Sequence, residues 1–278
     1  MQKSDYPAWD LDLDIAAFQW PAKSPRANIL LQHGLGEYST RYVHQYSEII
    51  PRLNELGFNV YAIDLPGHGF TPGIRGLVDV NEGVKLHLKA RAAIGKELPL
   101  FLLGHSLGGL VTIGSIMEQQ EGLAGAVVSS SAMQKPSSAF ERVLSKIMAT
   151  VAPSGPMPLP RPGLEALSRD QAVVEAAAVD PMFYQGKARN LVARTTLEVS
   201  DRVWEWARNW TLPVLFVHGD KDTSTDHKNS ITLFDKIAST DKTLKIYPGG
   251  YHELLNDLPK QEVLKEILDW LDQRAPRS

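Results

Sequence analysis

The sequence predicts an α/β fold, built as one mostly parallel sheet with helices on both of its faces. Short apolar runs alternate with segments of helical periodicity from Asn28 onward, and each run is long enough for one buried strand. Polar or glycine-rich residues follow most of these runs. Because the carboxyl ends of parallel strands meet at one edge of a sheet, we expect the functional site among the residues that follow the strands.

The first half of the chain supplies most of the predicted elements. Residues 9–20 alternate polar and apolar side chains, as an exposed edge hairpin does. Helices are predicted at residues 42–56, from about Asn81, and at residues 107–120. Buried strands are predicted at residues 28–32, 58–63, 99–103 and 125–131.

Residues 133–211 do not follow this alternation. We expect them to form a helical cap or lid inserted into a single domain that spans residues 1–278. Residues 140–151 carry apolar side chains at helical spacing, a pattern typical of packing against a core, and a proline-rich segment follows at residues 153–162. After the insertion we predict strands at residues 212–219 and 243–247, and then a last helix.

A single serine stands at the turn between the predicted strand 99–103 and the helix that follows. Gly104-His105-Ser106-Leu107-Gly108 has the Gly-x-Ser-x-Gly pattern of a nucleophile elbow. The glycines are required because a Cβ at either position would collide with neighbouring backbone. Such a turn raises the serine hydroxyl clear of the sheet, at the N-terminus of a helix whose amides can stabilise developing negative charge. Ser106 is therefore the predicted nucleophile.

A serine nucleophile requires a general base and an acid that orients the base, and both follow in the expected order. Asp222 lies in the polar loop after the predicted strand 212–219, with Asp220 and Asp226 as rival acids. His252 opens the loop after the predicted strand 243–247 and is the predicted base. The imidazole would take the serine proton, and the carboxylate would fix its tautomer and stabilise the imidazolium.

The other seven histidines fit the role of base less well. His44 and His87 fall on predicted helices, and His227 follows the acid too closely to come from the next strand. Four more stand beside a glycine at or near a strand end, where a hydrogen-bonded turn histidine is the simpler interpretation: His33, His68, His105 and His218.

The glycine-rich loop His33-Gly34-Leu35-Gly36-Glu37 follows the predicted strand 28–32 and lets backbone approach a substrate closely. We predict that the Leu35 amide is one donor of an oxyanion hole. The second donor should be the amide of Leu107, the residue after the nucleophile.

Composition excludes several classes of protein. The 29 basic and 32 acidic residues give a formal net charge of -3, which offers no basic field for nucleic acid or anionic lipid. The chain has no cysteine, so disulfides, thiol catalysis and cysteine-based metal sites are excluded. No apolar run approaches the roughly 18 residues of a membrane span, and the first residues lack the apolar region of a signal peptide. We therefore expect a cytoplasmic protein that binds no nucleic acid.

Together these motifs resemble the serine α/β-hydrolases, and within them the monoacylglycerol lipase and lysophospholipase-like group. Residues 33–42 are similar to that group's HGxGExxxRY segment, residues 67–69 to its GHG turn, residues 104–109 to its GHSxGG elbow, and residues 251–253 to its histidine loop. The group's acid falls in a Gly-x-x-Asp pattern, which matches Gly219 to Asp222. Ser168-Arg169-Asp170, continuing to Asp180-Pro181, resembles a pattern in the cap of the monoacylglycerol lipases.

This resemblance implies an α/β-hydrolase fold and hydrolysis of a carboxylic ester through an acyl-enzyme, with a medium-chain or long-chain monoacylglycerol as substrate. Neither a metal nor an organic cofactor is needed. A lysophospholipase, a broad carboxylesterase or a serine aminopeptidase would use the same residues, and a non-catalytic ligand receptor is the alternative from another class. A dehalogenase or epoxide hydrolase is disfavoured because it would carry an aspartate where this chain has Ser106.

The resemblance also bears on the surroundings of the site. The apolar stripe of residues 140–151 could line an acyl tunnel and present an apolar rim to a membrane or micelle. Glu37 and Arg41 could contact a glycerol hydroxyl or instead form an internal salt bridge that braces the oxyanion loop. Leu65 and Leu255 depart from the group, since its lipases often carry a basic residue near the first position and some relatives have a second histidine at the other.

Overall fold

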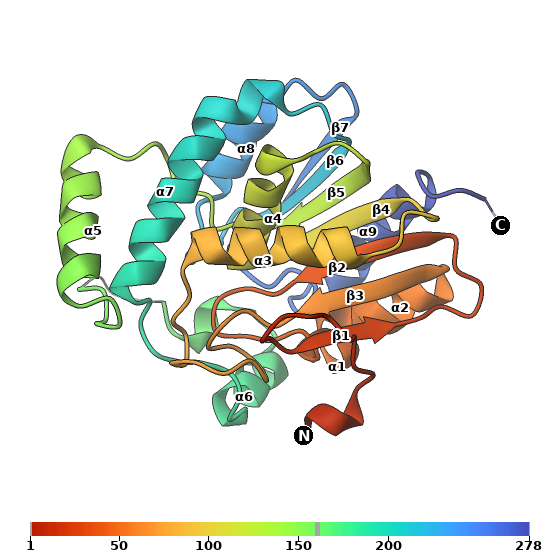
Figure 1. Cartoon of the computed structure of the whole chain (residues 1–278), viewed down its shortest axis with the longest axis horizontal. Helices are drawn as coiled ribbons and strands as arrows, with labels where there is room; N and C mark the ends of the chain where they lie inside the picture. Colours follow the sequence, from red (N-terminus) through yellow and green to blue (C-terminus); the bar gives the residue numbers. More distant parts are fainter. Residues whose placement is uncertain (1, 159–161, 278) are drawn as a thin grey trace.

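A computed structural model describes residues 2–158 and 162–277, and it contains one seven-stranded sheet in the order β1-β3-β2-β4-β5-β6-β7 (Figure 1). Strand β1 pairs antiparallel with β3 at one edge, and all other neighbours pair in parallel. The strands are β1 Ala17–Trp20, β2 Ala27–Gln32, β3 Phe58–Ile63, β4 Leu100–His105, β5 Leu123–Ser129, β6 Val214–Gly219 and β7 Lys242–Tyr247. The predicted mostly parallel sheet is confirmed.

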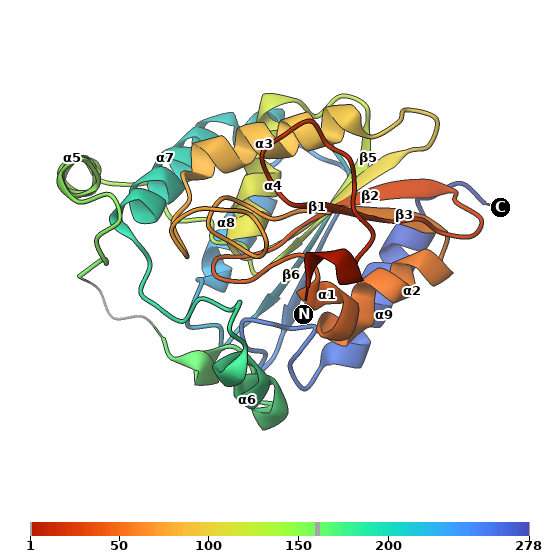
Figure 2. The same ribbon diagram turned by 60° about the horizontal axis from the view of Figure 1, so that its bottom comes forward.

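Helices cover both faces of the sheet (Figure 2). One layer contains α3 Val80–Ala93, α4 Leu107–Glu118, α7 Asn190–Trp206 and α8 His227–Lys236. The opposite layer contains α1 Arg41–His44, α2 Ile49–Glu55 and α9 Lys260–Asp272. Neighbouring strand residues alternate between the two cores, so that Leu102 packs in the first layer while Phe101 and Leu103 pack in the second.

The predicted hairpin at residues 9–20 is wrong in its first half. Only β1 forms a strand, and Ala8 makes a single bridge to Phe18. Leu11, Leu13 and Ile15 pack against the core from a series of tight turns, in which the Leu13 and Ile15 amides donate to carbonyls two residues earlier. The polar and apolar alternation therefore reflects side chains that point toward the core and toward solvent without a second strand.

The single helix predicted at residues 42–56 is divided into α1, the 3-10 turn Tyr46–Glu48 and α2. The three residues of the turn have positive φ values of 53°, 55° and 55°, which no α-helix contains. Tertiary contacts hold this conformation. The Tyr46 amide donates to the Asn256 side chain, and the Ser47 hydroxyl donates to the Leu255 carbonyl over 2.8 Å.

Between β5 and β6 the chain forms α5 Ala139–Val151, α6 Gln171–Val179 and α7, together with the short 3-10 turns Leu164–Ala166 and Ala207–Asn209. Helix α7 packs against α3 and α4 in the core, whereas α5 lies at the outer end of the molecule (Figure 1). Of the predicted proline-rich segment 153–162, residues 159–161 lie outside the described residues. Within the described ranges, no helix is both long and apolar enough to cross a bilayer.

Candidate active site

Ser106 occupies the sharp turn between β4 and α4. Its backbone angles, φ 54° and ψ -120°, lie in a region that side-chain-bearing residues rarely adopt. A Cβ at Gly104 would collide with the Thr112 hydroxyl and the Gly108 carbonyl, and one at Gly108 would collide with the Gln32 carbonyl. Glycine is therefore required at both flanking positions, as the elbow pattern predicts.

Three loops bring Ser106, His252 and Asp222 into one hydrogen-bonded chain. Ser106 Oγ lies 2.9 Å from His252 Nε2, and His252 Nδ1 lies 2.7 Å from Asp222 Oδ2. With Nδ1 protonated and donating to the carboxylate, Nε2 is free to accept the serine proton. The three residues predicted from the sequence thus meet at the carboxyl edge of the sheet, in the geometry that nucleophilic catalysis requires.

The charges of His252 and Asp222 stabilise one another. Burial disfavours the imidazolium, but the carboxylate of Asp222 outweighs this effect and raises the pKa of His252. Burial likewise opposes ionisation of Asp222, but His252 and further hydrogen-bond donors hold the pKa of Asp222 well below its usual range. The pair is therefore prepared to accept a proton at His252 while the carboxylate stays ionised.

Backbone and side-chain donors fix the orientation of Asp222. Its Oδ1 accepts the amides of Ser224 and Thr225 over 2.8 and 2.9 Å, and its Oδ2 accepts the Thr225 hydroxyl over 2.7 Å. The rival acids have other partners, since Asp220 accepts the Gly249 amide and Asp226 caps the N-terminus of α8. Of the three aspartates, the structure places only Asp222 against His252.

One of the histidines assigned to turns touches the acid. His218 Nε2 lies 3.2 Å from Asp222 Oδ2, and the ring is fully buried at the end of β6. The sequence signal for this contact is weak, because it consists of a histidine four residues before an aspartate. His33 and His68 do form the expected turn contacts, with Nδ1 2.8 Å from the Gly34 carbonyl and 2.9 Å from the Pro66 carbonyl, respectively.

The glycine-rich loop after β2 lies directly against the serine. A Cβ at Gly34 would come within 2.9 Å of the Ser106 Cβ. Leu35 and Leu107 line the same cavity as Ser106. Within residues 2–158 and 162–277, neither of their amides donates to a protein acceptor. Both predicted oxyanion donors therefore lie beside the serine with their amides available to a ligand.

Glu37 forms the internal network that was one of its two predicted roles. Its Oε1 accepts the Gly34 amide over 2.6 Å and the Tyr42 hydroxyl over 2.9 Å. Its Oε2 accepts the Tyr46 hydroxyl over 2.8 Å and the Arg41 guanidinium over 3.2 Å. Glu37 is only 3% exposed, and these four donors occupy both oxygens of its carboxylate.

Arg41 connects this network to the loop that carries His252. Its guanidinium donates to both carboxylate oxygens of Glu253, over 2.7 and 3.1 Å. Although burial opposes ionisation, Arg41 lowers the pKa of Glu253 to about 2. The glycine-rich loop after β2 and the histidine loop are therefore joined by one buried cluster, defined by Glu37, Arg41 and Glu253.

Ser106 and His252 open into a cavity of about 780 Å³. Its walls come from the sheet edge on one side and from residues 133–211 on the other. Six of the apolar residues in the wall are Leu144, Met148, Leu164, Leu167, Phe183 and Leu197. A mostly apolar cavity of this size that also presents polar groups is typical of a small-molecule site.

The motif Ser168-Arg169-Asp170, which continues to Asp180-Pro181, connects residues 133–211 to the loop that carries His252. Arg169 donates to both oxygens of Asp257, over 2.8 to 3.1 Å. Asp170 pairs with Lys260 over 2.9 Å, and Asp180 accepts the Tyr38 hydroxyl over 2.7 Å. These contacts anchor residues 168–180 beside the loops that carry Tyr38 and His252.

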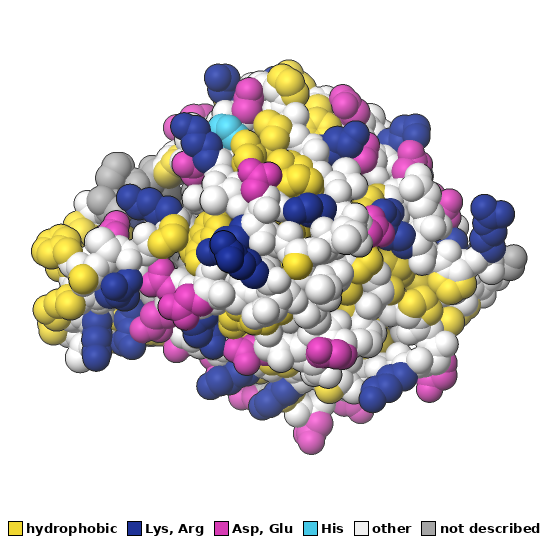
Figure 3. All heavy atoms as spheres, turned by 90° about the horizontal axis from the view of Figure 1, so that it is seen from above, with side chains coloured by type: hydrophobic (Ala, Val, Ile, Leu, Met, Phe, Trp, Pro, Cys, Tyr) yellow, Lys and Arg dark blue, Asp and Glu magenta, His cyan; other side chains and the backbone are white. Residues whose placement is uncertain are grey.

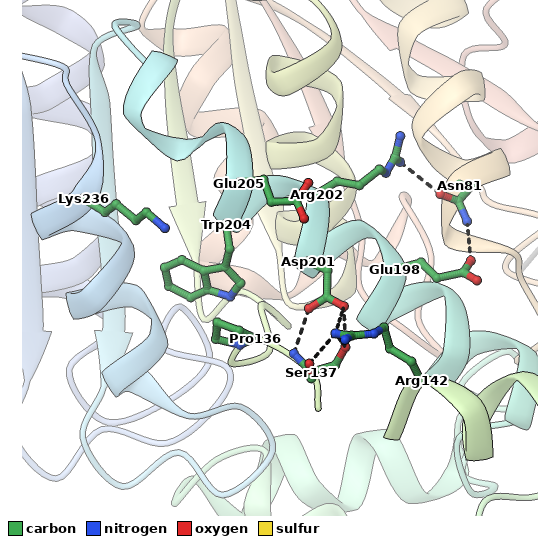
Figure 4. A pocket seen from close by; sticks show the side chains of 10 residues that line it. All are labelled: Asn81, Pro136, Ser137, Arg142, Glu198, Asp201, Arg202, Trp204, Glu205 and Lys236. Atoms are coloured by element: carbon green, nitrogen blue, oxygen red, sulfur yellow. Dashed lines mark hydrogen bonds and ion pairs between the residues drawn. The ribbon is translucent and has the colours of Figure 1, made fainter. Parts of the chain in front are cut away.

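A second hollow, of about 750 Å³, lies between α7, α5, α3 and α8 (Figure 4). Its charged side chains mostly bind one another: Asp201 accepts the Ser137 amide over 2.8 Å and lies 3.6 Å from Arg142, and Arg202 donates to Asn81. None of the five predicted site residues lines it. The chemistry predicted from the sequence belongs to the first cavity.

The fold and this site together define a serine α/β-hydrolase. A model of the family described as "Serine aminopeptidase, S33" matches residues 23–259, and the chain belongs to this family.

Two relatives are similar to this chain over most of its length. The monoacylglycerol lipase of Mycolicibacterium smegmatis is 33% identical over 258 residues, which cover 90% of each chain. The human monoglyceride lipase is 34% identical over 267 residues, which cover 92% of this chain and 85% of the relative. Taken with the family match, these relatives make the protein a carboxylic ester hydrolase by class.

Among solved structures, the monoacylglycerol lipase of Paleococcus ferrophilus superimposes with a TM-score of 0.82 at 30% sequence identity. The match covers 95% of this chain and all of that one. The predicted α/β-hydrolase fold and the resemblance to the monoacylglycerol lipase group are confirmed.

Proposed function

We propose that this protein hydrolyses monoacylglycerols to glycerol and a free fatty acid. The observation that carries the proposal is the hydrogen-bonded chain from Ser106 through His252 to Asp222, which opens into a mostly apolar cavity of about 780 Å³. The names of the relatives support the choice of a monoacylglycerol among possible esters.

In the proposed first step, Ser106 Oγ attacks the ester carbonyl while His252 Nε2 takes the hydroxyl proton. The tetrahedral intermediate collapses when His252 returns that proton to the glycerol oxygen, which leaves as the alcohol. Asp222 keeps Nδ1 protonated throughout and stabilises the imidazolium. Ser106 then carries the acyl group as an ester.

In the second step, a water molecule loses a proton to His252 Nε2 and attacks the acyl-enzyme. The proton returns to Ser106 Oγ as the carbon to serine bond breaks, and the fatty acid is released. The Leu35 and Leu107 amides would donate to the negative oxygen in both steps, which is the largest single stabilisation available to such a site.

We further propose that residues 133–211 act as a cap over the acyl chain. Met148 lines the cavity, whereas its neighbour Ile147 is 56% exposed. Phe140, Val143 and Val151 on the same helix are 73%, 59% and 79% exposed. Apolar side chains gather at this end of the molecule (Figure 3). An exposed apolar face beside the entrance to a lipid site suits transient contact with a membrane or micelle surface. The cytoplasmic location stays a prediction.

The test is the release of fatty acid from a monoacylglycerol, the matching diacylglycerol and the matching lysophospholipid at one chain length. We expect the monoacylglycerol to be preferred, with Ser106→Ala abolishing the activity. Preference for the lysophospholipid would make the protein a lysophospholipase. Cleavage of only a short activated ester would make it a general carboxylesterase, and cleavage of only an amino-acyl amide would make it an aminopeptidase.

The same assay separates an enzyme from a ligand receptor. A receptor would bind the lipid with negligible turnover, which a single-turnover experiment detects. Labelling by a serine-directed phosphonate should disappear in Ser106→Ala, and persistent labelling at another serine would reject Ser106 as the nucleophile.

A further inference from the structure

Two imidazole rings share one oxygen of the proposed catalytic acid. Asp222 Oδ2 lies 2.7 Å from His252 Nδ1 and 3.2 Å from His218 Nε2. The side chains of His218 and Asp222 are both fully buried. His218 belongs to β6, which ends one residue later, so a strand in the middle of the core holds its ring in place.

The neighbours of His218 determine which of its ring nitrogens carries the proton. An ionised carboxylate can only accept, so Nε2 must be protonated in order to bond with Asp222. In the neutral ring Nδ1 is then an acceptor, and Ser230 Oγ, 2.8 Å away on α8, can donate to it. Thr225 Oγ1 lies 3.1 Å from the same Nε2 and can share its proton. Both ring nitrogens thus have partners without any positive charge on the ring.

We propose that His218 is a positioning residue for hydrolysis: its neutral ring, oriented by Ser230, directs Asp222 Oδ2 toward His252 and withdraws part of the negative charge from that oxygen. This inference rests on the proposed function, which makes Asp222 the acid. His218 is not among the residues that line the cavity, so it acts through Asp222 and does not touch the substrate.

Loss of the His218 donor has a specific kinetic signature. It lowers kcat and leaves KM nearly unchanged, because substrate contacts are unaltered. It also moves the acid limb of kcat/KM to higher pH, because a carboxylate with one donor fewer favours the charged form of His252 more strongly. A residue with a packing role alone would not move the pH profile in this way.

Four other titratable groups lie near these rings, and none of them is substituted in the variants compared below. They are His227 on α8, Glu37 after β2, His105 at the end of β4, and Glu253 beside His252.

Two substitutions at one position separate the donor from the bulk of the ring. His218→Gln places an amide N–H2 near the position of Nε2 and keeps the donor to Asp222. The asparagine side chain in His218→Asn is shorter, so its amide can reach Ser230 Oγ but not Asp222 Oδ2. The two variants carry the same chemical group and differ by one methylene, which makes them a matched pair.

The readouts are kcat and KM on a short p-nitrophenyl ester, the pH profile, and the rate at which a fluorophosphonate labels Ser106. A hydrogen bond to a charged group is worth about 1.5–3 kcal/mol, so we expect His218→Asn to lower kcat and the labelling rate by about tenfold or more. KM should change less than about twofold. His218→Gln should recover most of the rate, and Ser230→Ala, which leaves Nε2 in place but removes the group that orients the ring, should show a smaller loss and a smaller shift of the acid limb in the same direction.

Equal losses in His218→Asn and His218→Gln, without a shift of the pH profile, would overturn the proposal, as would a His218→Asn enzyme of unaltered kcat. If His218→Asn does not fold, Ser230→Ala and His218→Gln still decide the question through the acid limb. Asp222→Asn serves as the reference: if that variant keeps full activity, the proposed acid is wrong and the whole mechanism fails. If it loses activity while the His218 variants do not, only the role of His218 is rejected.

Discussion

Glu37 should support both the stability of the fold and the rate of catalysis, and the substitution Glu37→Gln tests both. The buried carboxylate accepts four donors: the Gly34 amide, the hydroxyls of Tyr42 and Tyr46, and the Arg41 guanidinium. A glutamine has the same shape, but its N–H2 group cannot accept. In either orientation of the amide, two of these donors lose their acceptor.

The magnitude follows from those two donors. A buried donor without an acceptor costs about 1–3 kcal/mol, and Arg41 keeps its second partner Glu253, so we expect Glu37→Gln to lower the free energy of unfolding by about 2–4 kcal/mol. The Gly34 amide belongs to the residue before Leu35. Since losing one oxyanion donor costs about 10²–10³ in kcat, displacing the Leu35 amide should cost about 10–100-fold.

Urea unfolding followed by tryptophan fluorescence measures the stability, and turnover of a short p-nitrophenyl ester measures the rate. Tyr42→Phe is the matched control, because it removes one donor and leaves no donor unpaired. We expect Tyr42→Phe to lower the free energy of unfolding by about 1 kcal/mol and to leave kcat within about threefold of the wild-type value. A Glu37→Gln protein that unfolds like the wild type and turns over at the same rate would refute the bracing role.

Three further results are expected. Asp222→Asn should slow turnover by several orders of magnitude because it favours the wrong tautomer of the catalytic histidine. Asp220→Asn changes only a turn contact, so its kcat should stay within about tenfold of the wild-type value. The reverse order of the two effects would mean that the acid is misassigned. Ile147→Ser should weaken sedimentation with liposomes but leave hydrolysis of a short ester unchanged, because Ile147 is exposed. Met148→Ser should raise KM for substrates with long acyl chains, because Met148 lines the cavity. Loss of both liposome binding and short-ester hydrolysis in Ile147→Ser would indicate misfolding. The Glu253 pKa of about 2 lies below its ordinary value of 4.5, so its contribution to stability is present above pH 4.5 and is lost as the pH falls toward 2. Thermal unfolding at a series of pH values should therefore show that the stability of Glu253→Gln depends less on pH between 4.5 and 2 than that of the wild type.

The three residues proposed as nucleophile, acid and base could be selected from the sequence because each depends on a local signal. The strained turn at Ser106 requires glycine on both sides, and a sequence displays that requirement directly. Asp222 follows the buried strand β6, which the sequence shows as an apolar run, and His252 follows the half-buried strand β7, which it shows as an alternation of polar and apolar residues. Chain order then leaves few candidates for each role.

The contacts around these residues could not be predicted, because they depend on side-chain directions and on distant partners. Nothing in the sequence shows that His218 turns its Nε2 toward Asp222 and its Nδ1 toward Ser230 on another helix. Ile147 and Met148 are equivalent members of one apolar stripe, but adjacent residues point about 100° apart on a helix. One therefore faces solvent and the other lines the cavity.

The division of the predicted helix at residues 42–56 shows the same limit, and it yields a prediction about stability. Glu48 has φ 55° and ψ 41°, a left-handed conformation that costs a residue with a Cβ about 1–2 kcal/mol. Its side chain is largely exposed, and its ion pair with Arg52 at 3.4 Å is worth little at such a surface. A glycine at this position adopts the left-handed conformation without that penalty. It also increases the conformational entropy of the unfolded chain, which lowers the free energy of unfolding by about 0.5–1 kcal/mol.

Glu48→Gly should therefore raise the free energy of unfolding by about 0.5–1 kcal/mol. Glu48→Ala removes the same charge and keeps a Cβ, so it should give no increase. Urea unfolding of the two variants side by side separates the backbone effect from the loss of the ion pair. If alanine stabilises the protein as much as glycine does, the left-handed turn carries no strain. The segment Tyr46–Glu48 would then be held at no cost by its contacts to Leu255 and Asn256.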